Sequence, residues 1–193
     1  MASSLPIPAT ITANTKPTAA SFNTYRDSLM QLQGLTPTGG QGPLDFAIVK
    51  QTVSQNLVTS TLTAILFDAE TVDKAGGHST VTNTSRYVFL TPGYHRIEAT
   101  LLVAASATAH QLQCYLQMNG TATDANQFAF AEPDAGNSAT VGSAVTVTGI
   151  TPFAVNGTTD YVELIGWQNS GGTLATTVGV RGGSRISVQW ASA

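Results

Sequence analysis

Apolar residues recur at every second position in several segments after residue 45, and this two-residue period restricts the fold more than any other feature of the sequence. The clearest case is residues 112–118, in which Leu, Cys, Leu and Met alternate with Gln, Tyr and Gln. Successive side chains of a β-strand point to opposite faces, so the pattern predicts a strand with one buried face and one wet face. The same period predicts further strands, whose inward residues are Ile97, Ala99, Leu101 and Val103; Leu62, Ala64 and Leu66; Val145 and Val147; and Ile186, Val188 and Trp190.

The predicted strands are short and are separated by turn signals, of which the Asn119-Gly120 and Asn156-Gly157 pairs are typical. Asn-Gly supplies the positive φ angles that tight hairpins need. Residues 160–168 are apolar almost without interruption, as expected of a central strand, while residues 121–142 contain Pro133 and two glycines and predict a surface loop. Together these features predict an all-β, antiparallel sandwich or barrel for residues 46–193.

Residues 1–45 have a different character and predict a separate N-terminal arm. Three prolines favour an extended start, and the Gly/Pro-rich stretch from Thr36 to Pro43 predicts a linker. Between them, apolar residues at intervals of three and four predict one short helix over about residues 22–33. Its stripe consists of Phe22, Tyr25, Leu29 and Leu32. This stripe packs either on its own domain and symmetry mates or on a larger assembly, and the sequence leaves both open.

Charge and cysteine content exclude several classes of partner and site. Eight basic and eleven acidic residues give a formal net charge of −3, without a basic cluster, so we expect no nucleic-acid partner. No window approaches the roughly 18 to 20 apolar residues of a membrane-spanning helix, and Met1 to Pro8 does not read as a signal peptide. The single cysteine, Cys114, rules out an intrachain disulfide and a multi-cysteine zinc site.

The densest group of ionisable residues is Asp68, Glu70 and Asp73, with His78 nearby. Oxygen ligands at this spacing could hold a hard cation, but a solvated or arginine-paired acidic turn is the favoured interpretation. His78, His95 and His110 stand apart from one another, and metal-binding, phosphate-binding and nucleophile-elbow motifs are missing.

We therefore expect no metal, no cofactor and no enzymatic activity, with a glycosidase-type pair of carboxylates as the one enzymatic alternative. Cys114 lies on the inward face of its predicted strand and is expected to be a buried, inert thiol. Asn83, Asn119 and Asn156 begin Asn-x-Ser/Thr triplets, and two of them coincide with Asn-Gly turns, which explains them without glycosylation.

Several short stretches resemble the globular-head domains of complement and tumour-necrosis-factor-like proteins as they recur in bacteriophage structural proteins. They are Phe67 to Asp73, His78-Ser79, Ser85 to Val88, Thr91 to Tyr94, Asp160 to Leu164 and Ser184 to Trp190. Within the arm, Thr18 to Ala20, Phe22-Asn23, Arg26-Asp27 and Leu29 resemble the attachment segments that precede such domains in tail-fibre, minor-tail and head-decoration proteins.

The resemblance implies a jelly roll of ten or a similar number of strands that assembles as a threefold-symmetric homotrimer. It further implies a non-enzymatic bacteriophage virion protein, a surface projection held to the capsid or tail by its N-terminal arm, with Phe22, Tyr25, Leu29 and Leu32 as anchoring residues. The alternative is a host-surface carbohydrate-binding adhesin module. The family's receptor-contact loops would fall at Thr121 to Gly142 and Asn169 to Thr173, which hold no diagnostic residues.

Overall fold

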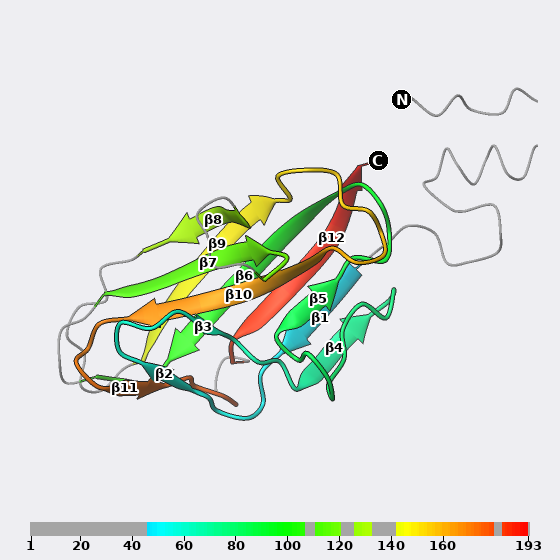
Figure 1. Cartoon of the computed structure of the whole chain (residues 1–193). Coiled ribbons are helices and arrows are strands. Elements are labelled where there is room, and N and C mark those ends of the chain that lie inside the picture. The colour runs from blue at the N-terminus through cyan, green and yellow to red at the C-terminus, as the bar shows by residue number, and fades with distance from the viewer. Residues whose placement is uncertain (1–45, 107–110, 121–125, 133–141, 180–182, 193) are drawn as a thin grey trace, which may run out of the picture. The chain divides into compact units, whose positions relative to one another are not determined.

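The computed structural model describes residues 46–106, 111–120, 126–132, 142–179 and 183–192, and its strands form a two-layered antiparallel sandwich (Figure 1). The predicted helix over residues 22–33 lies outside the described residues. The first sheet has the order β4-β1-β12-β6-β9. Its strands are β4 (Ala69–Asp73), β1 (Phe46–Lys50), β12 (Arg185–Ser192), β6 (Tyr94–Val103) and β9 (Ser143–Ile150).

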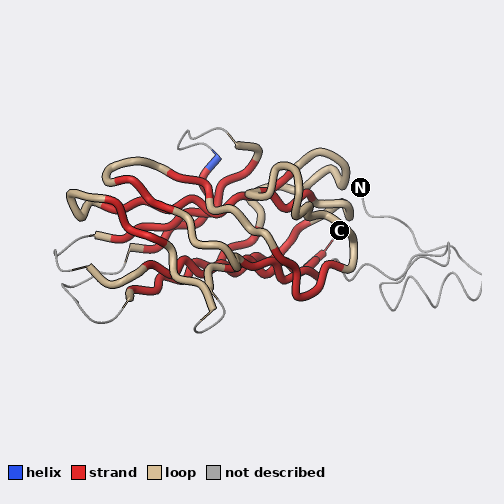
Figure 2. The backbone as a smooth tube through the Cα atoms, turned by 90° about the horizontal axis from the view of Figure 1, so that it is seen from below, coloured by secondary structure: helices blue, strands red, loops and turns tan. Residues whose placement is uncertain are grey.

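The second sheet has the order β3-β10-β7-β8, and β5 also pairs with β10. Its strands are β3 (Thr63–Ala64), β10 (Tyr161–Gln168), β7 (Leu112–Met118), β8 (Gln127–Ala131) and β5 (Arg86–Val88). A small ribbon joins β2 (Asn56–Val58) to β11 (Thr173–Ala175). The fold is therefore the predicted all-β jelly roll, and Figure 2 shows its strands running lengthwise.

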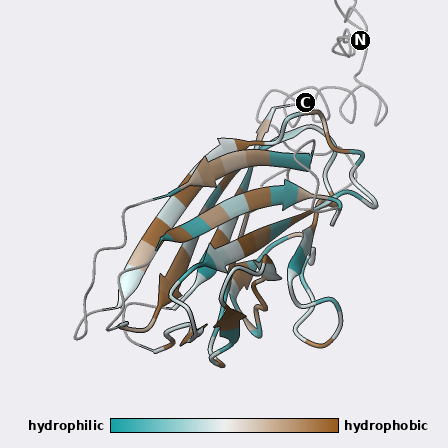
Figure 3. Cartoon of the chain, turned by 60° about the vertical axis from the view of Figure 1, so that its left-hand side comes forward, coloured by the Kyte–Doolittle hydropathy of each residue, from teal (hydrophilic) through white to brown (hydrophobic). Residues whose placement is uncertain are grey.

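The core lies between the two sheets and includes most of the predicted inward residues. Trp190, predicted inward with Ile186 and Val188, is only partly buried, at the end of β12 where the pairing with β6 shifts register. Alternate side chains of β6 and β7 are fully or almost fully buried, and Figure 3 shows the same alternation as bands of hydrophobic and hydrophilic residues along the strands. Strand β10 is central in its sheet, as its continuous apolar sequence predicts. Gly166 on this strand faces the core, where an added Cβ would lie 2.9 Å from the Leu101 side chain, so a larger residue would have to displace that side chain.

The predicted phase of residues 62–66 is wrong. Ile65 and Phe67 are completely buried, whereas Leu62 and Leu66 are exposed. Apolar residues occupy both the odd and the even positions of this stretch, so the period alone cannot decide which set points inward. The short pairing of β3 with β10, which aligns Ala64 with Ile165, decides it.

The predicted surface loop over residues 121–142 also needs correction, because it contains strand β8. Pairing of β8 with β7 aligns Tyr115 with Phe130 and continues the second sheet by one strand. The segment is short, rich in alanine and interrupted by a register shift, so its sequence lacks a clear two-residue period.

The corrected phase can be tested with two neighbouring substitutions. Ile65→Ala removes a fully buried side chain and should lower the free energy of unfolding by about 2 to 5 kcal/mol. Leu66→Ala removes one that is 46% exposed and should cost less than about 1 kcal/mol. Urea denaturation of both variants measures the difference, and equal losses would contradict the assignment.

Candidate functional site

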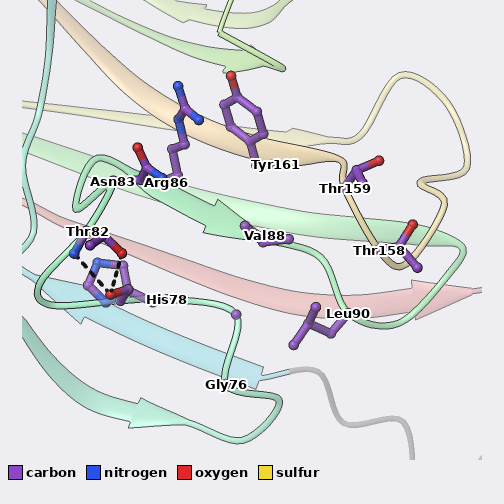
Figure 4. A pocket seen from close by; sticks show the side chains of 12 residues that line it. Gly76, His78, Thr82, Asn83, Arg86, Val88, Leu90, Thr158, Thr159 and Tyr161 are labelled. Atoms are coloured by element: carbon purple, nitrogen blue, oxygen red, sulfur yellow. Dashed lines mark hydrogen bonds between the residues drawn. The ribbon is translucent and has the colours of Figure 1, made fainter.

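An open groove of about 440 Å³ lies over β5, between the loop that follows β4 and the turn that precedes β10 (Figure 4). Its floor includes Val88 and Leu90, and Arg86 and Tyr161 stand side by side at its edge. The remaining lining residues are Gly76, Gly77, His78, Ser79, Thr82, Asn83, Thr158 and Thr159.

The wall formed by residues 76–78 is packed directly on β5. The backbone N–H of Val88 donates to the Gly77 carbonyl at 2.8 Å, and His78 forms an antiparallel bridge with Tyr87. A Cβ atom on Gly77 would lie 2.2 Å from the Val88 carbonyl oxygen, so only glycine fits at this contact. The wall is thus fixed by backbone geometry.

Arg86 is held from two sides. Its guanidinium carbon lies 4.3 Å from the centroid of the Tyr161 ring, a cation–π contact, and its Nε lies 3.5 Å from Oε1 of Glu163. The Ser85 hydroxyl donates to the same carboxylate oxygen at 2.6 Å. Glu163 is only 6% exposed, and a buried carboxylate is costly unless it has partners. The Arg86 pair is too long for a strong hydrogen bond, so Ser85 provides the bond and Arg86 the compensating charge.

The opposite wall is fixed by a side-chain network. The Asn156 Oδ1 atom accepts the backbone N–H groups of Thr158 and Thr159 at 2.8 and 2.9 Å. Asp160 in turn accepts from the Asn156 backbone N–H at 2.8 Å and from the Asn119 side chain at 3.0 Å. The turn that carries Thr158 and Thr159 is therefore tied to the hairpin at Asn119.

The acidic residues singled out in the sequence serve separate local roles. Asp73 accepts the backbone N–H groups of Gly76 and His78, each at 2.9 Å, and Glu70 lies 3.0 Å from Nδ1 of His78. Asp68 accepts from the Thr52 hydroxyl and from the backbone N–H of Thr52. The acidic turn is organised by backbone groups and His78, and the described part of the chain contains no group of three potential metal ligands.

The pKa of Asp68 shifts below its ordinary value. Partial burial acts to raise this pKa, but hydrogen bonds from the Thr52 hydroxyl and from the backbone N–H groups of Thr52 and Val53 lower it more. Asp68 thus joins residues 52–53 to the start of β4 as an ionised carboxylate.

The other chemically notable residues are dispersed. His95 is buried beside Phe89, with ring centroids 4.6 Å apart, and His110 lies outside the described residues. Of the two predicted Asn-Gly turns, Asn119 has a φ angle of 55°, whereas Asn156 has no positive φ and instead accepts the N–H groups of Thr158 and Thr159. Asn83 also has a positive φ angle, 51°. The proposed anchoring residues Phe22, Tyr25, Leu29 and Leu32 all lie outside the described residues.

Sequence reasoning missed the cluster of Arg86, Tyr161 and Glu163. The usable signal was the glutamate inside an otherwise apolar strand, since a carboxylate in such a strand needs a partner. The sequence contained no means of deciding that the partners are Ser85 and Arg86, which precede Glu163 by 78 and 77 positions.

Solved structures with the same fold are tumour-necrosis-factor-like jelly rolls. Murine APRIL matches with a TM-score of 0.51 and 11% identity over 75% of this chain and 97% of that chain. Eiger TNF from S. frugiperda matches with a TM-score of 0.52 and 10% identity over 78% of this chain and 95% of that chain. At these identities the likeness shows the fold alone.

No protein-family model matches the sequence, and no curated protein matches it either. Among the described residues, no helix is long and apolar enough to cross a membrane.

Cys114 is the buried thiol that its strand position predicts, and this gives a pH-dependent test. Burial raises its pKa from 9.0 to about 12, so the folded state favours the protonated thiol. The resulting stabilisation is fully present below pH 9 and is lost as the pH rises from 9 toward 12. The difference in unfolding free energy between the native chain and Cys114→Ala should therefore be constant below pH 9 and shrink above it, as measured by urea denaturation. A difference that stays constant to pH 11 would contradict the shift.

Proposed function

We propose that this chain is a non-enzymatic structural protein of a bacteriophage virion, in which a trimeric jelly-roll head projects from an N-terminal arm. The arm attaches the head to the tail or the capsid, and the head stabilises its neighbours or contacts the host surface. The tumour-necrosis-factor-like jelly roll is the coarse part of this proposal that the structure establishes. The assembly, the virion location and the absence of catalysis are inferred.

The observation that carries the proposed trimer is the exposed apolar seam where the two sheets end at β8 and β9. Phe130 on β8 is 53% exposed and Ile150 on β9 is 58% exposed. Phe128, also on β8, is half-buried and packs against the core. Exposed apolar side chains on two neighbouring edge strands suit an interaction surface.

The seam also combines two sheet edges. Within the described residues, no strand pairs with the outer edge of β8 or of β9. Unpaired edges of this kind are normally covered or blocked in natural proteins. A hollow of about 430 Å³ lies beside the seam and is lined by Tyr115, Gln127, Phe128, Ala129 and Phe130. Association of identical copies around a closed symmetry axis would cover both edges and the exposed side chains.

Substitutions at the seam should weaken the assembly. Phe130→Ser and Ile150→Ser should each raise the dissociation constant of the oligomer by about tenfold or more, because both remove apolar area from the interface. Sedimentation equilibrium of the full chain measures this. Val81→Ser is the matched control, because Val81 is 85% exposed but belongs to the loop before β5. A monomeric native chain, or equal effects of all three substitutions, would contradict the seam as an interface.

Attachment through the arm can be tested separately. Deletion of residues 1–35 should abolish incorporation into virus particles while leaving the circular dichroism spectrum of the head β-rich. Quantitative mass spectrometry of purified particles measures incorporation. Unchanged incorporation of the shortened chain would remove the arm from the proposal.

A second candidate function is a carbohydrate-binding adhesin module, and the groove over β5 favours it. The groove combines a fixed arginine, hydroxyl and amide groups and an apolar floor, which together suit a polar ligand with apolar C–H faces. A glycan array probed with the full chain tests this function independently of virion incorporation.

A further inference from the structure

We propose that the groove over β5 binds an acidic saccharide, one that carries a carboxylate, and that Arg86 is its anion-binding residue. This inference deepens the adhesin candidate and is independent of the proposed trimer. Four features of the groove support it: its charge, the fixed orientation of Arg86, the engaged state of the nearby backbone N–H groups, and the polar rim.

The charge of the lining favours an anion. Among the described residues that line the groove, Arg86 is the only one whose side chain is permanently charged. The carboxylates around the groove, Glu70, Asp73, Asp160 and Glu163, are not part of the lining. Glu70 faces His78, Asp73 and Asp160 accept N–H groups of their own turns, and Glu163 faces Ser85 and Arg86. The permanently charged group that a ligand meets in the groove is thus the Arg86 guanidinium, whose charge Glu163 compensates only from its Nε edge.

Arg86 is already ordered for binding. The Tyr161 ring lies 4.3 Å from the guanidinium carbon, and Glu163 faces the Nε edge at 3.5 Å, so the side chain is contacted on two sides. The two terminal nitrogens remain to form the paired hydrogen bonds that a guanidinium makes with a carboxylate. Since a free arginine loses side-chain entropy on binding, a side chain that is ordered beforehand gives a higher affinity.

The loop beside Arg86 is poorly suited to a phosphate group. Phosphate sites in glycine-rich loops use several backbone N–H groups at once. Here the N–H groups of Gly76 and His78 already donate to Asp73, at 2.9 Å each. Two N–H groups of this loop are thus already engaged, and the charged group that the groove offers is a single guanidinium, which matches a carboxylate better.

The rim and floor match the rest of a sugar. The Thr158 hydroxyl donates to Asn156 Oδ1 at 3.1 Å, which leaves its lone pairs to accept a bond. The Thr159 hydroxyl accepts from Asn156 Nδ2 at 2.7 Å, which leaves its own proton to donate. Val88 and Leu90 offer apolar contact to the C–H face of a ring. The volume of about 440 Å³ lies within the range of small-ligand sites, roughly 300 to 1,000 Å³, and suits one or two sugar units.

The test is an NMR titration of the full chain with methyl β-D-glucuronide, against methyl β-D-glucoside as the neutral match. The glucuronide should bind more tightly than the glucoside, with the largest shifts at Arg86 and in residues 158–161. Leu90 is 43% exposed at the groove floor, so its replacement leaves the Arg86 pair intact. Leu90→Glu should weaken glucuronide binding by about tenfold or more through repulsion, whereas Leu90→Lys should preserve or tighten it.

Arg86→Gln should abolish the preference for the glucuronide, while Arg96→Gln, an exposed arginine on β6, should leave it unchanged. Asn83→Gly keeps the left-handed backbone while removing the amide, and should weaken both sugars by a few-fold. Three results would each overturn the proposal: equal binding of the two sugars, no binding of either sugar, or the same glucuronide affinity in the Leu90→Glu and Leu90→Lys variants. Sedimentation of the same samples measures the oligomer size independently. A negative sugar titration would therefore overturn the binding proposal and say nothing about the trimer.

Discussion

Strand β10 is the element on which the rest of the structure depends, because its side chains are buried on both faces. Val162 and Leu164 point into the core, whereas Glu163 and Ile165 lie on the opposite face and are only 6% and 5% exposed. A strand buried on both faces needs cover on each, and a carboxylate there needs a compensating partner. Ser85 and Arg86 provide that partner and hold the segment of β5 against β10. The groove over β5 is a consequence of this arrangement.

The same sheet ends at β8, whose outer edge and exposed apolar side chains are not covered by another described strand. Its last strand and the last strand of the other sheet leave a seam with exposed Phe130 and Ile150. The two proposals therefore use separate parts of one sandwich. The first places self-association at the seam of β8 and β9, and the second places ligand binding at the groove beside β5, which pairs with β10 on the side away from β7 and β8.

The sequence predicted the strands with a clear two-residue period, including residues 112–118 and 185–190, because alternation of apolar side chains follows directly from strand geometry. It could not fix the phase of residues 62–66, where both the odd and the even positions carry apolar residues. It also missed β8, whose sequence lacks a clear two-residue period and whose strand conformation depends on pairing with β7. The groove escaped prediction for another reason. Arg86 and Glu163 are distant in sequence and meet only through the pairing of β5 with β10, while the acidic residues near His78, adjacent in sequence, proved to be local capping groups.

The central claim is that identical copies meet at the β8–β9 seam, and hydrogen–deuterium exchange of the full chain at high and low protein concentration tests it most directly. Backbone amides of residues 127–131 and 143–150 should become more protected as the concentration rises through the dissociation constant, while those of β4 stay unchanged. Protection of the seam that is independent of concentration, or concentration-dependent protection confined to other strands, would contradict the account.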